Sequence, residues 1–298
     1  MSVADLRVFE LARYRSVEAL CELLANRHAK RLATVLLAGG TDWLVEREMA
    51  RTVAPGEQTP LVVDVSRMQE LRGIELSGDT LRIGAATTYL EMRRSEVVRQ
   101  RAPLIERMAR DIGAVQIQAR GTLGGNLATG SPAADGVAAL AAYDAVVVVR
   151  SARGERGIPL AELQTGYKRT SRAPDELIVA VDLSLAPAGS PWIWRKVGTR
   201  RAQAISKVAL AGIAEIADGR ATRFGLGMAS VAPVTARMVA TRALVLSRPL
   251  AEIGAADVAS AVERDVTPID DVRSTRAYRL HSARAVTALW LRELGAKT

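Results

Sequence analysis

The stretch RGTLGGNLATGSPAAD, residues 120–135, is the most unusual segment of this sequence because it holds four glycines in sixteen positions. Its centre is TLGGN, Thr122–Asn126. Paired glycines let a ligand approach the backbone closely, and the threonine hydroxyl and the asparagine amide beside them can form hydrogen bonds. We therefore interpret Thr122–Asn126 as a loop that brings backbone amides close to an anionic ligand.

A second glycine pair occurs in AGGTD, Ala38–Asp42, between an apolar run at 33–37 and a helical pattern at 42–50. A strand, a glycine turn and a helix start can form a nest of N–H groups for anionic oxygen. An ordinary strand-to-helix turn has the same pattern and remains an alternative. Two such loops could hold the two phosphates of a dinucleotide from opposite sides. Neither loop fits the Walker A pattern or the G-x-G-x-x-G fingerprint.

The rest of the chain predicts an α+β protein with a break near residue 190. Residues 186–191, APAGSP, are rich in Pro, Gly and Ser and are typical of a linker. Beyond them, strand patterns come first and helical patterns follow, which indicates a separate α+β domain. Before the linker we expect strands at 61–66, 71–76 and 79–87 in a meander or mixed sheet, a helix at 102–114, a hairpin at 145–160 and a strand at 175–185.

Composition excludes several classes of protein. No apolar run approaches the roughly 20 residues that span a bilayer, and the N-terminal residues lack the order of a signal peptide, so we expect a cytoplasmic protein without a membrane span. The net charge is +9, but 41 basic residues are mixed with 32 acidic ones and only 4% of residues are aromatic. This pattern favours a docking face or an anionic ligand over nucleic acid.

The chain holds one cysteine and two histidines, too few for a four-cysteine iron-sulfur cluster or a structural zinc site. Cys21 lies on the apolar face of a predicted helix and is expected to pack in a core. His28 is expected at the surface and His281 on a helix face. We therefore expect no metal site in this chain and no catalytic base at either histidine.

Four segments in consistent order, LLAGGTDWL, IGAATT, RGTLGGNLATGSPAAD and WRKVGTRRAQAISKV, together resemble the FAD-binding (medium) subunit of the xanthine dehydrogenase and carbon monoxide dehydrogenase family of molybdenum hydroxylases. The resemblance runs from about residue 4 to 295. It implies a two-subdomain FAD-binding domain of the vanillyl-alcohol oxidase type, followed by a smaller α+β C-terminal domain. The implied ranges are 1–186, with subdomains at about 1–58 and 59–186, and 192–298.

The same resemblance implies which residues contact FAD. The first diphosphate loop would be Ala38, Gly39, Gly40, Thr41 and Asp42, and the second Thr122, Leu123, Gly124, Gly125 and Asn126. Backbone amides and both threonine hydroxyls would hold the pyrophosphate.

Four further positions match family contacts outside the two loops. Asp135 matches an acid that contacts the cofactor, although a helix N-cap is an alternative role. Lys196 matches a lysine close to the flavin, where a fixed cation would raise the electron affinity of the ring; a solvated basic face is its alternative. Ile178 matches a backbone contact. Ile112 stands where eukaryotic xanthine oxidoreductases have a phenylalanine near the ring.

By resemblance, the chain is one subunit of a heterotrimer, assembled as a dimer of heterotrimers. A molybdenum-pterin subunit would hydroxylate the substrate, and a [2Fe-2S] subunit would relay electrons to FAD and on to NAD⁺, O₂ or another acceptor. FAD is expected to be noncovalent, because neither histidine is near a glycine loop. The alternatives are a free-standing FAD-dependent oxidase or dehydrogenase with its own substrate pocket, and a non-enzymatic nucleotide-binding protein.

Overall fold

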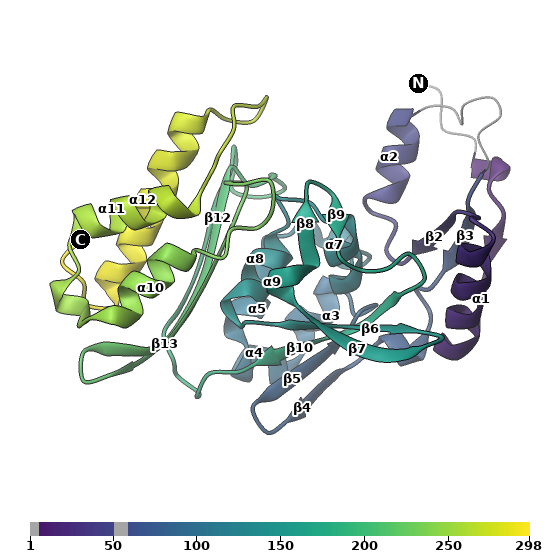
Figure 1. Cartoon of the computed structure of the whole chain (residues 1–298), viewed down its shortest axis with the longest axis horizontal. Coiled ribbons are helices and arrows are strands. Elements are labelled where there is room, and N and C mark those ends of the chain that lie inside the picture. Colours follow the sequence, from purple (N-terminus) through teal and green to yellow (C-terminus); the bar gives the residue numbers. More distant parts are fainter. Residues whose placement is uncertain (1–5, 51–58) are drawn as a thin grey trace.

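The computed structural model describes residues 6–50 and 59–298, which form three larger sheets along the long axis of the molecule and one two-stranded sheet (Figure 1). At one end lies a parallel sheet of order β1-β3-β2, beside α1. Its elements are η1 Leu6–Val8, β1 Leu11–Ala12, α1 Val17–Ala29, β2 Thr34–Leu37, α2 Trp43–Ala50 and β3 Leu61–Asp64. Ser16 caps α1 by accepting a hydrogen bond from the amide of Ala19. The predicted apolar face of α1, including Cys21, is buried in the core of this lobe.

The middle of the molecule is an antiparallel sheet of order β4-β5-β10-β6-β7. Its strands are β4 Ile74–Ser77, β5 Thr80–Gly84, β6 Val146–Ser151, β7 Gly154–Pro159 and β10 Leu177–Ser184, and a small pair is formed by β8 Gln164–Gly166 and β9 Arg169–Thr170. The helical elements of this lobe are η2 Gln69–Leu71, α3 Tyr89–Arg94, α4 Glu96–Arg101, α5 Pro103–Arg110, α6 Val115–Gln118, α7 Leu123–Thr129, α8 Asp135–Ala142 and α9 Leu160–Leu163.

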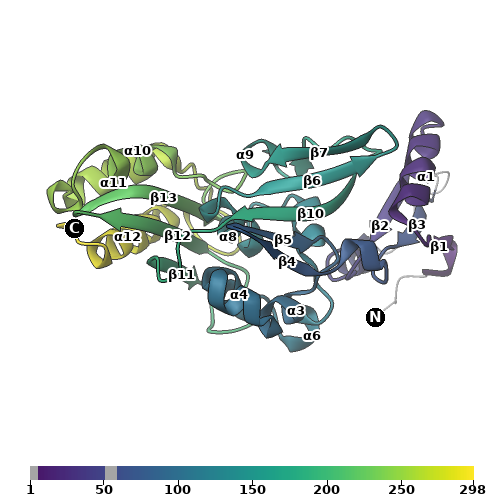
Figure 2. The same cartoon turned by 90° about the horizontal axis from the view of Figure 1, so that it is seen from below.

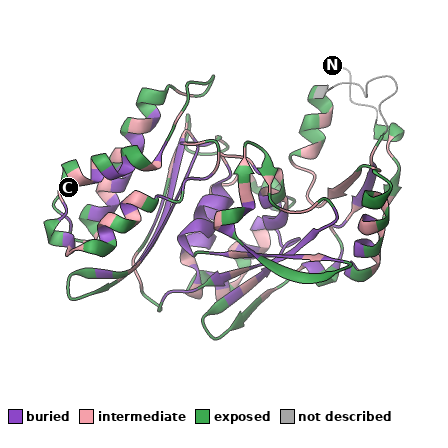
Figure 3. Ribbon diagram, viewed as in Figure 1, coloured by how far each residue is buried: buried purple, intermediate pink, exposed green. Residues whose placement is uncertain are grey.

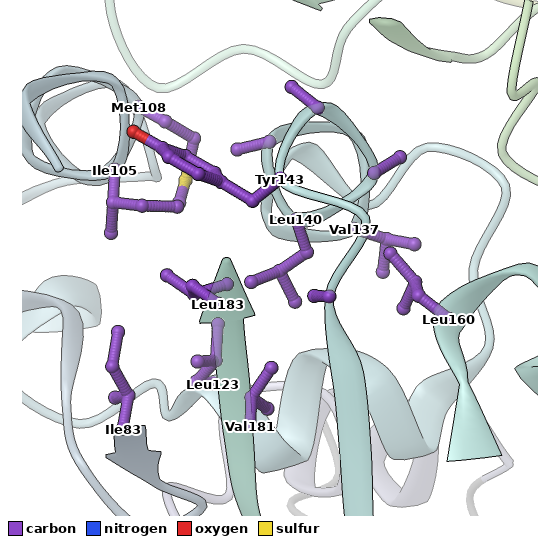
Figure 4. Close-up of a cluster of buried hydrophobic side chains, with 14 of the residues drawn as sticks. Ile83, Ile105, Met108, Leu123, Val137, Leu140, Tyr143, Leu160, Val181 and Leu183 are labelled. Atoms are coloured by element: carbon purple, nitrogen blue, oxygen red, sulfur yellow. The ribbon is translucent and has the colours of Figure 1, made fainter. Parts of the chain in front are cut away.

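Helix α8 is the centre of this lobe, and all eight of its residues are buried (Figure 3). Its apolar side chains pack against α5 and the sheet, where Leu140 and Tyr143 meet Ile105 and Met108 (Figure 4). Because α8 is apolar on every side, it must be covered on every side. The second sheet and α5 cover only part of it.

The third sheet, of order β11-β12-β13, supplies the remaining cover (Figure 2). Its lobe consists of β11 Trp192–Val197, β12 Val208–Ala217, β13 Arg220–Ala229, α10 Val239–Ser247, η3 Leu250–Glu252, α11 Ala255–Asp265 and α12 Arg276–Glu293. One face of this sheet packs on α5 and α8, and the other packs on α10 and α12. The sheet is therefore shared by two cores, of which only one belongs to the C-terminal lobe itself.

Most of the expected elements are confirmed, including the hairpin β6–β7, strand β10 and the order of strands before helices after residue 191. The α+β fold class is confirmed as well. The expectation that the runs at 61–66, 71–76 and 79–87 form one meander or mixed sheet is wrong, because Leu61–Asp64 pairs in parallel with β1 and β2 in the first sheet, whereas β4 and β5 pair in the middle sheet. The subdomain boundary expected near residue 58 lies outside the described residues.

No helix within residues 6–50 and 59–298 is long and apolar enough to cross a membrane.

Candidate functional site

A cavity of about 460 Å³ lies between the first lobe and the middle lobe. A smaller cavity of about 160 Å³ shares Leu36, Ala38, Gly125 and Ala128 with it, so the two cavities adjoin. Of the predicted site residues, the larger cavity is lined by Ala38, Gly39, Gly40, Thr41, Asp42, Ile112, Thr122, Gly125 and Asn126, and the smaller one by Ala38, Gly124, Gly125 and Ile178. The structure therefore brings both glycine segments to one site.

The first glycine segment has the open backbone that the sequence predicts. Gly40 has a φ of +75°, a conformation that favours glycine. A Cβ atom at Gly39 would lie 2.1 Å from the carbonyl oxygen of Arg120, so Gly39 lets the first segment touch the backbone that leads into the second. Within the described residues, the amides of Gly39, Gly40 and Thr41 donate no hydrogen bond to the protein. These three amides are available for an anionic ligand.

The second segment differs from the prediction, because Leu123–Asn126 is the first turn of α7 rather than a loop. The Thr122 hydroxyl accepts a hydrogen bond from the amide of Gly125 at 3.1 Å and thereby caps this helix.

The amides of the second segment other than that of Thr122 are engaged within the protein. Those of Leu123 and Gly124 donate to the carbonyl oxygens of Thr87 and Ala85, and that of Asn126 donates to the carbonyl oxygen of Thr122. The expectation that both loops offer free amides therefore holds only for the first one. Gly125, which has no side chain, and Asn126 are the residues of the second segment's helical turn that line the larger cavity.

Two polar contacts brace the first lobe against the middle lobe beside the cavity. The Thr129 hydroxyl lies 2.9 Å from Asp42 Oδ2 and 2.9 Å from the carbonyl oxygen of Gly125, so it connects both glycine segments. The Lys168 ammonium donates to Glu46 Oε1 on α2 at 2.6 Å. Asp42 therefore positions the first segment through its carboxylate.

Asp135 and Lys196 form a buried ion pair that lines neither cavity. Lys196 Nζ donates to Asp135 Oδ2 at 2.6 Å and to the carbonyl oxygen of Asp111 at 2.9 Å, and the Ser206 hydroxyl donates to Asp135 Oδ1 at 2.6 Å. The two side chains are only 10% and 9% exposed. Burial raises the pKa of Asp135, while Lys196 and Ser206 oppose that shift.

These contacts argue against the two structural alternatives, an N-cap at Asp135 and a solvated basic face at Lys196. Ala134, not Asp135, is the N-cap of α8. The Asp135 carboxylate is paired with Lys196 and accepts a hydrogen bond from Ser206. Burial of Lys196 likewise excludes a solvated basic face at this position. Leu123, the third predicted residue away from both cavities, is fully buried in the core.

Several cavity residues were not identified from the sequence. Tyr89, Trp43 and Lys168 line the larger cavity, and Arg172 lines the smaller one. Burial lowers the pKa of the Arg172 guanidinium. The only sequence signal nearby is the capping box at Thr88, which fixes where the helix that carries Tyr89 begins.

Comparison with known families identifies the chain. Residues 7–184 match the family described as the FAD binding domain in molybdopterin dehydrogenase, and residues 194–294 match the CO dehydrogenase flavoprotein C-terminal domain. The chain therefore belongs to the FAD-binding subunits of the molybdenum hydroxylases.

Individual relatives agree with this assignment. The xanthine dehydrogenase FAD-binding subunit of Escherichia coli O157:H7 is 29% identical over 284 residues, which cover 94% of each chain. The carbon monoxide dehydrogenase medium chain of Hydrogenophaga pseudoflava is 28% identical, over 86% of this chain and 89% of that one. A solved structure of carbon monoxide dehydrogenase from H. pseudoflava has a TM-score of 0.84 and 26% identity, with 95% of both chains covered.

The residues at the paired cavities fit FAD. Three free amides in the first segment suit pyrophosphate oxygens, and a side chain at Gly125 would project where the two cavities meet. The smaller cavity has a largely apolar wall that includes Leu24, Val65 and Leu177, which suits an aromatic ring. The histidines lie elsewhere: His28 on α1 and His281 on α12 are exposed and line neither cavity.

Proposed function

We propose that this flavoprotein chain serves a heterotrimeric complex, receiving electrons from an iron-sulfur subunit after substrate oxidation at a molybdenum-pterin subunit and passing them to NAD⁺, O₂ or another acceptor. The observation that carries the proposal is the paired cavity at the junction of two glycine segments, in a chain of this family. The proposal includes a dimer of heterotrimers, and it places the complex in the cytoplasm, where NAD⁺ is available.

Most of the predicted residues have a role in this proposal that their own contacts allow, whereas Leu123 is buried in the core and has none. The amides of Gly39, Gly40 and Thr41 would hold the pyrophosphate, and Gly125 would leave room for it. Ile112 and Asn126 would contact the cofactor from the larger cavity, and Gly124 and Ile178 from the smaller one.

Lys196 would act from behind the wall of the cavity. Its charge is compensated by Asp135 and fixed by the carbonyl oxygen of Asp111, next to Ile112. A cation held in this way would stabilise negative charge on a reduced flavin ring nearby. When bound, FAD supplies the redox chemistry, so no side chain of this chain needs to act as a general base.

We also propose the domain limits 1–186 and 192–298. The turn at 187–190 between β10 and β11 supports this division, as do the two family matches on either side of it. The shared packing of α8 and the third sheet implies that the two domains form one folding unit.

The visible absorption spectrum of the purified chain, titrated with FAD before and after acid precipitation, tests this proposal. We expect flavin bands at one equivalent, and yellow colour in the supernatant after acid. Colour in the pellet would contradict noncovalent binding. A chain that bleached on addition of a small organic substrate without partner subunits would instead be a free-standing oxidase.

A further inference from the structure

Two buried polar atoms beside the larger cavity have no hydrogen-bond partner in the described structure: the hydroxyl oxygen of Tyr89 and Oδ1 of Asn126. Both residues line the cavity, although these two atoms are themselves inaccessible to solvent. A buried polar group without a partner costs free energy, so a pair of such groups in one place is unusual in a folded protein.

The two atoms face the same small space but do not hydrogen-bond to each other in the structure. A Cβ atom at Gly136 would lie 2.4 Å from Asn126 Oδ1 and 3.1 Å from the Tyr89 hydroxyl oxygen, so both atoms crowd the same small volume at the start of α8. One is a donor and the other an acceptor, because burial, together with the charges of Asp135 and Asp42, raises the pKa of Tyr89 and keeps the phenol protonated. The pair is chemically complementary.

The position of Tyr89 is set by the backbone around it. Thr88 caps α3 directly before Tyr89, and the amide of Tyr89 donates to the carbonyl oxygen of Gly121 at 3.1 Å. The Tyr89 ring lies so close to Gly121 that a Cβ atom there would be 3.4 Å from it. The ring is therefore fixed against the segment that leads into α7, and its hydroxyl is directed toward Asn126 and Gly136.

We propose that Tyr89 is a positioning residue for FAD binding: a small rotation of the Asn126 side chain brings Oδ1 within reach of the Tyr89 hydroxyl, which then donates to it and directs the Asn126 amide nitrogen into the cavity as a donor. The inference rests on the proposed contact between Asn126 and FAD. With Oδ1 held by Tyr89, the amide has one orientation, and a cofactor acceptor meets a preset donor rather than a rotating one.

The test is a double-mutant cycle on FAD affinity in the full chain, with Tyr89→Phe, Asn126→Ala and the double variant. We expect Tyr89→Phe to weaken FAD binding roughly three- to tenfold, as loss of one hydrogen bond does. The double variant should bind as weakly as Asn126→Ala alone, because Tyr89 acts through Asn126. Incorporation of 4-aminophenylalanine at position 89 restores a donor and should restore affinity.

Tyr143→Phe is the matched control. Tyr143 is also a fully buried tyrosine whose hydroxyl has no partner in the described structure, but it lies in the core between α5 and α8 and lines neither cavity (Figure 4). Its replacement should leave FAD affinity within about twofold of the wild-type value. Equal losses in Tyr89→Phe and Tyr143→Phe, or additive losses in the cycle, would overturn the proposal.

A second measurement separates this proposal from the assignment of the FAD site. Urea unfolding of the same four proteins without FAD reports whether Tyr89 and Asn126 are coupled in the free chain. Non-additive changes in the urea unfolding midpoint support the hydrogen bond between Tyr89 and Asn126 even if the wild-type chain does not bind FAD. In that case the result contradicts the proposed FAD function and not the hydrogen bond. Additive midpoints contradict the hydrogen bond whatever the FAD affinity.

Discussion

At the scale of single residues, the four glycines of the two segments serve different physical needs. Gly40 has a positive φ, and Gly39 allows contact with the Arg120 backbone. A Cβ atom at Gly124 would collide with Ala85, so this glycine lets α7 pack on the strand end. At Gly125 a Cβ atom would meet only the Thr122 hydroxyl, at 3.0 Å. Of the four glycines, only Gly125 lines both cavities, and no neighbouring backbone requires a glycine at this position.

We therefore expect Gly125→Val to keep the fold and lose FAD. The new side chain would project into the space that the cofactor needs, and such overlap weakens binding by at least about tenfold. Flavin absorbance of the purified variant measures the loss. Gly166→Val is the control, because the nearest atom to a Cβ there is the Arg169 side chain at 3.9 Å. A fully yellow Gly125→Val protein would contradict the site.

The ion pair of Asp135 and Lys196 leads to a second prediction at this scale. Lys196→Ala leaves a buried carboxylate with Ser206 as its remaining partner, which should cost about 3–5 kcal/mol of stability at neutral pH. Burial already raises the pKa of Asp135, and loss of the cation raises it further. The folded variant therefore binds a proton that the unfolded chain releases.

The sign of the pH effect follows from this proton. When folding raises the pKa of a carboxyl group, the free energy of unfolding of the protein falls as pH rises. The deficit of Lys196→Ala relative to wild type should be smallest at about pH 4, near the unfolded-state pKa of an aspartate, and grow toward pH 8. Urea unfolding at several pH values measures it, with Asp135→Asn/Lys196→Ala as a control that shows no such dependence. An equal deficit at both pH values would argue against a buried, ionised Asp135.

At the scale of elements, the sequence predicts best where a local pattern has a single structural solution. Helix α1 and hairpin β6–β7 follow from periodicity, and Pro103 begins α5 as expected. The sequence predicts poorly where distant segments decide. Leu61–Asp64 joins β2 and not β4. Leu123–Asn126 forms the first turn of α7, whose first two amides donate to the carbonyl oxygens of Thr87 and Ala85.

In the candidate site, too, the residues set by a local pattern could be predicted from the sequence, and those set by contacts between distant segments could not. Both glycine segments could be predicted, since paired glycines are favoured where a backbone must come close to a ligand or to another backbone. Tyr89 and Arg172 could not, because each reaches the cavities only through the pairing of strands far apart in sequence. The partnership of Lys196 with Asp135 is likewise a contact across 61 positions, which no local pattern shows.

Two ion pairs tie the β6–β7 hairpin to the start of β10 and give a prediction for this scale. Asp175 and Glu176 are buried and bind Arg153 and Arg156, which lowers the pKa of both carboxyl groups. Stability from a lowered pKa is present above about pH 4 and is lost as pH falls through the folded-state pKa. Asp175→Asn should cost about 1–3 kcal/mol at pH 7 and progressively less below pH 4.

Urea unfolding at pH 7, 4 and 3 checks the effect of Asp175→Asn. Asp79→Asn is the control, because Asp79 is paired with Arg101 but its side chain is 84% exposed. An exposed pair of this kind contributes at most about 1 kcal/mol. If the two variants were equally stable at every pH, the Asp175 pair would not be a significant link between the hairpin and β10.

At the scale of the whole molecule, α8 joins the middle lobe to the C-terminal lobe. Two glycines of β13 allow direct backbone contact with it: a Cβ atom at Gly225 would lie 1.9 Å from the carbonyl oxygen of Ala142, and one at Gly227 would lie 2.3 Å from that of Ala138. The N-terminal end of the same helix carries Asp135, next to the cavity wall. Any displacement of the third sheet from α8 should therefore reach the FAD site.

Gly225→Ala tests this coupling. The added methyl group meets backbone, which cannot move aside as a flexible side chain does, so we expect a loss of about 1–3 kcal/mol and a melting temperature lower by roughly 3–10 °C. Because the strain acts on α8, FAD affinity should fall as well. Gly212→Ala is the comparison, since its Cβ would press on Trp290 on the other face of the same sheet, at 2.8 Å from Nε1.

Calorimetry and FAD titration of the two variants distinguish coupled lobes from independent ones. Gly212→Ala should lower the melting temperature and leave FAD affinity nearly unchanged, because its strain is contained in the core formed with α10 and α12. Gly225→Ala should change both quantities. If Gly225→Ala lost stability but bound FAD like the wild type, the C-terminal lobe would cover α8 without influencing the site, and the position of Lys196 on β11 would have to be maintained by its own hydrogen bonds alone.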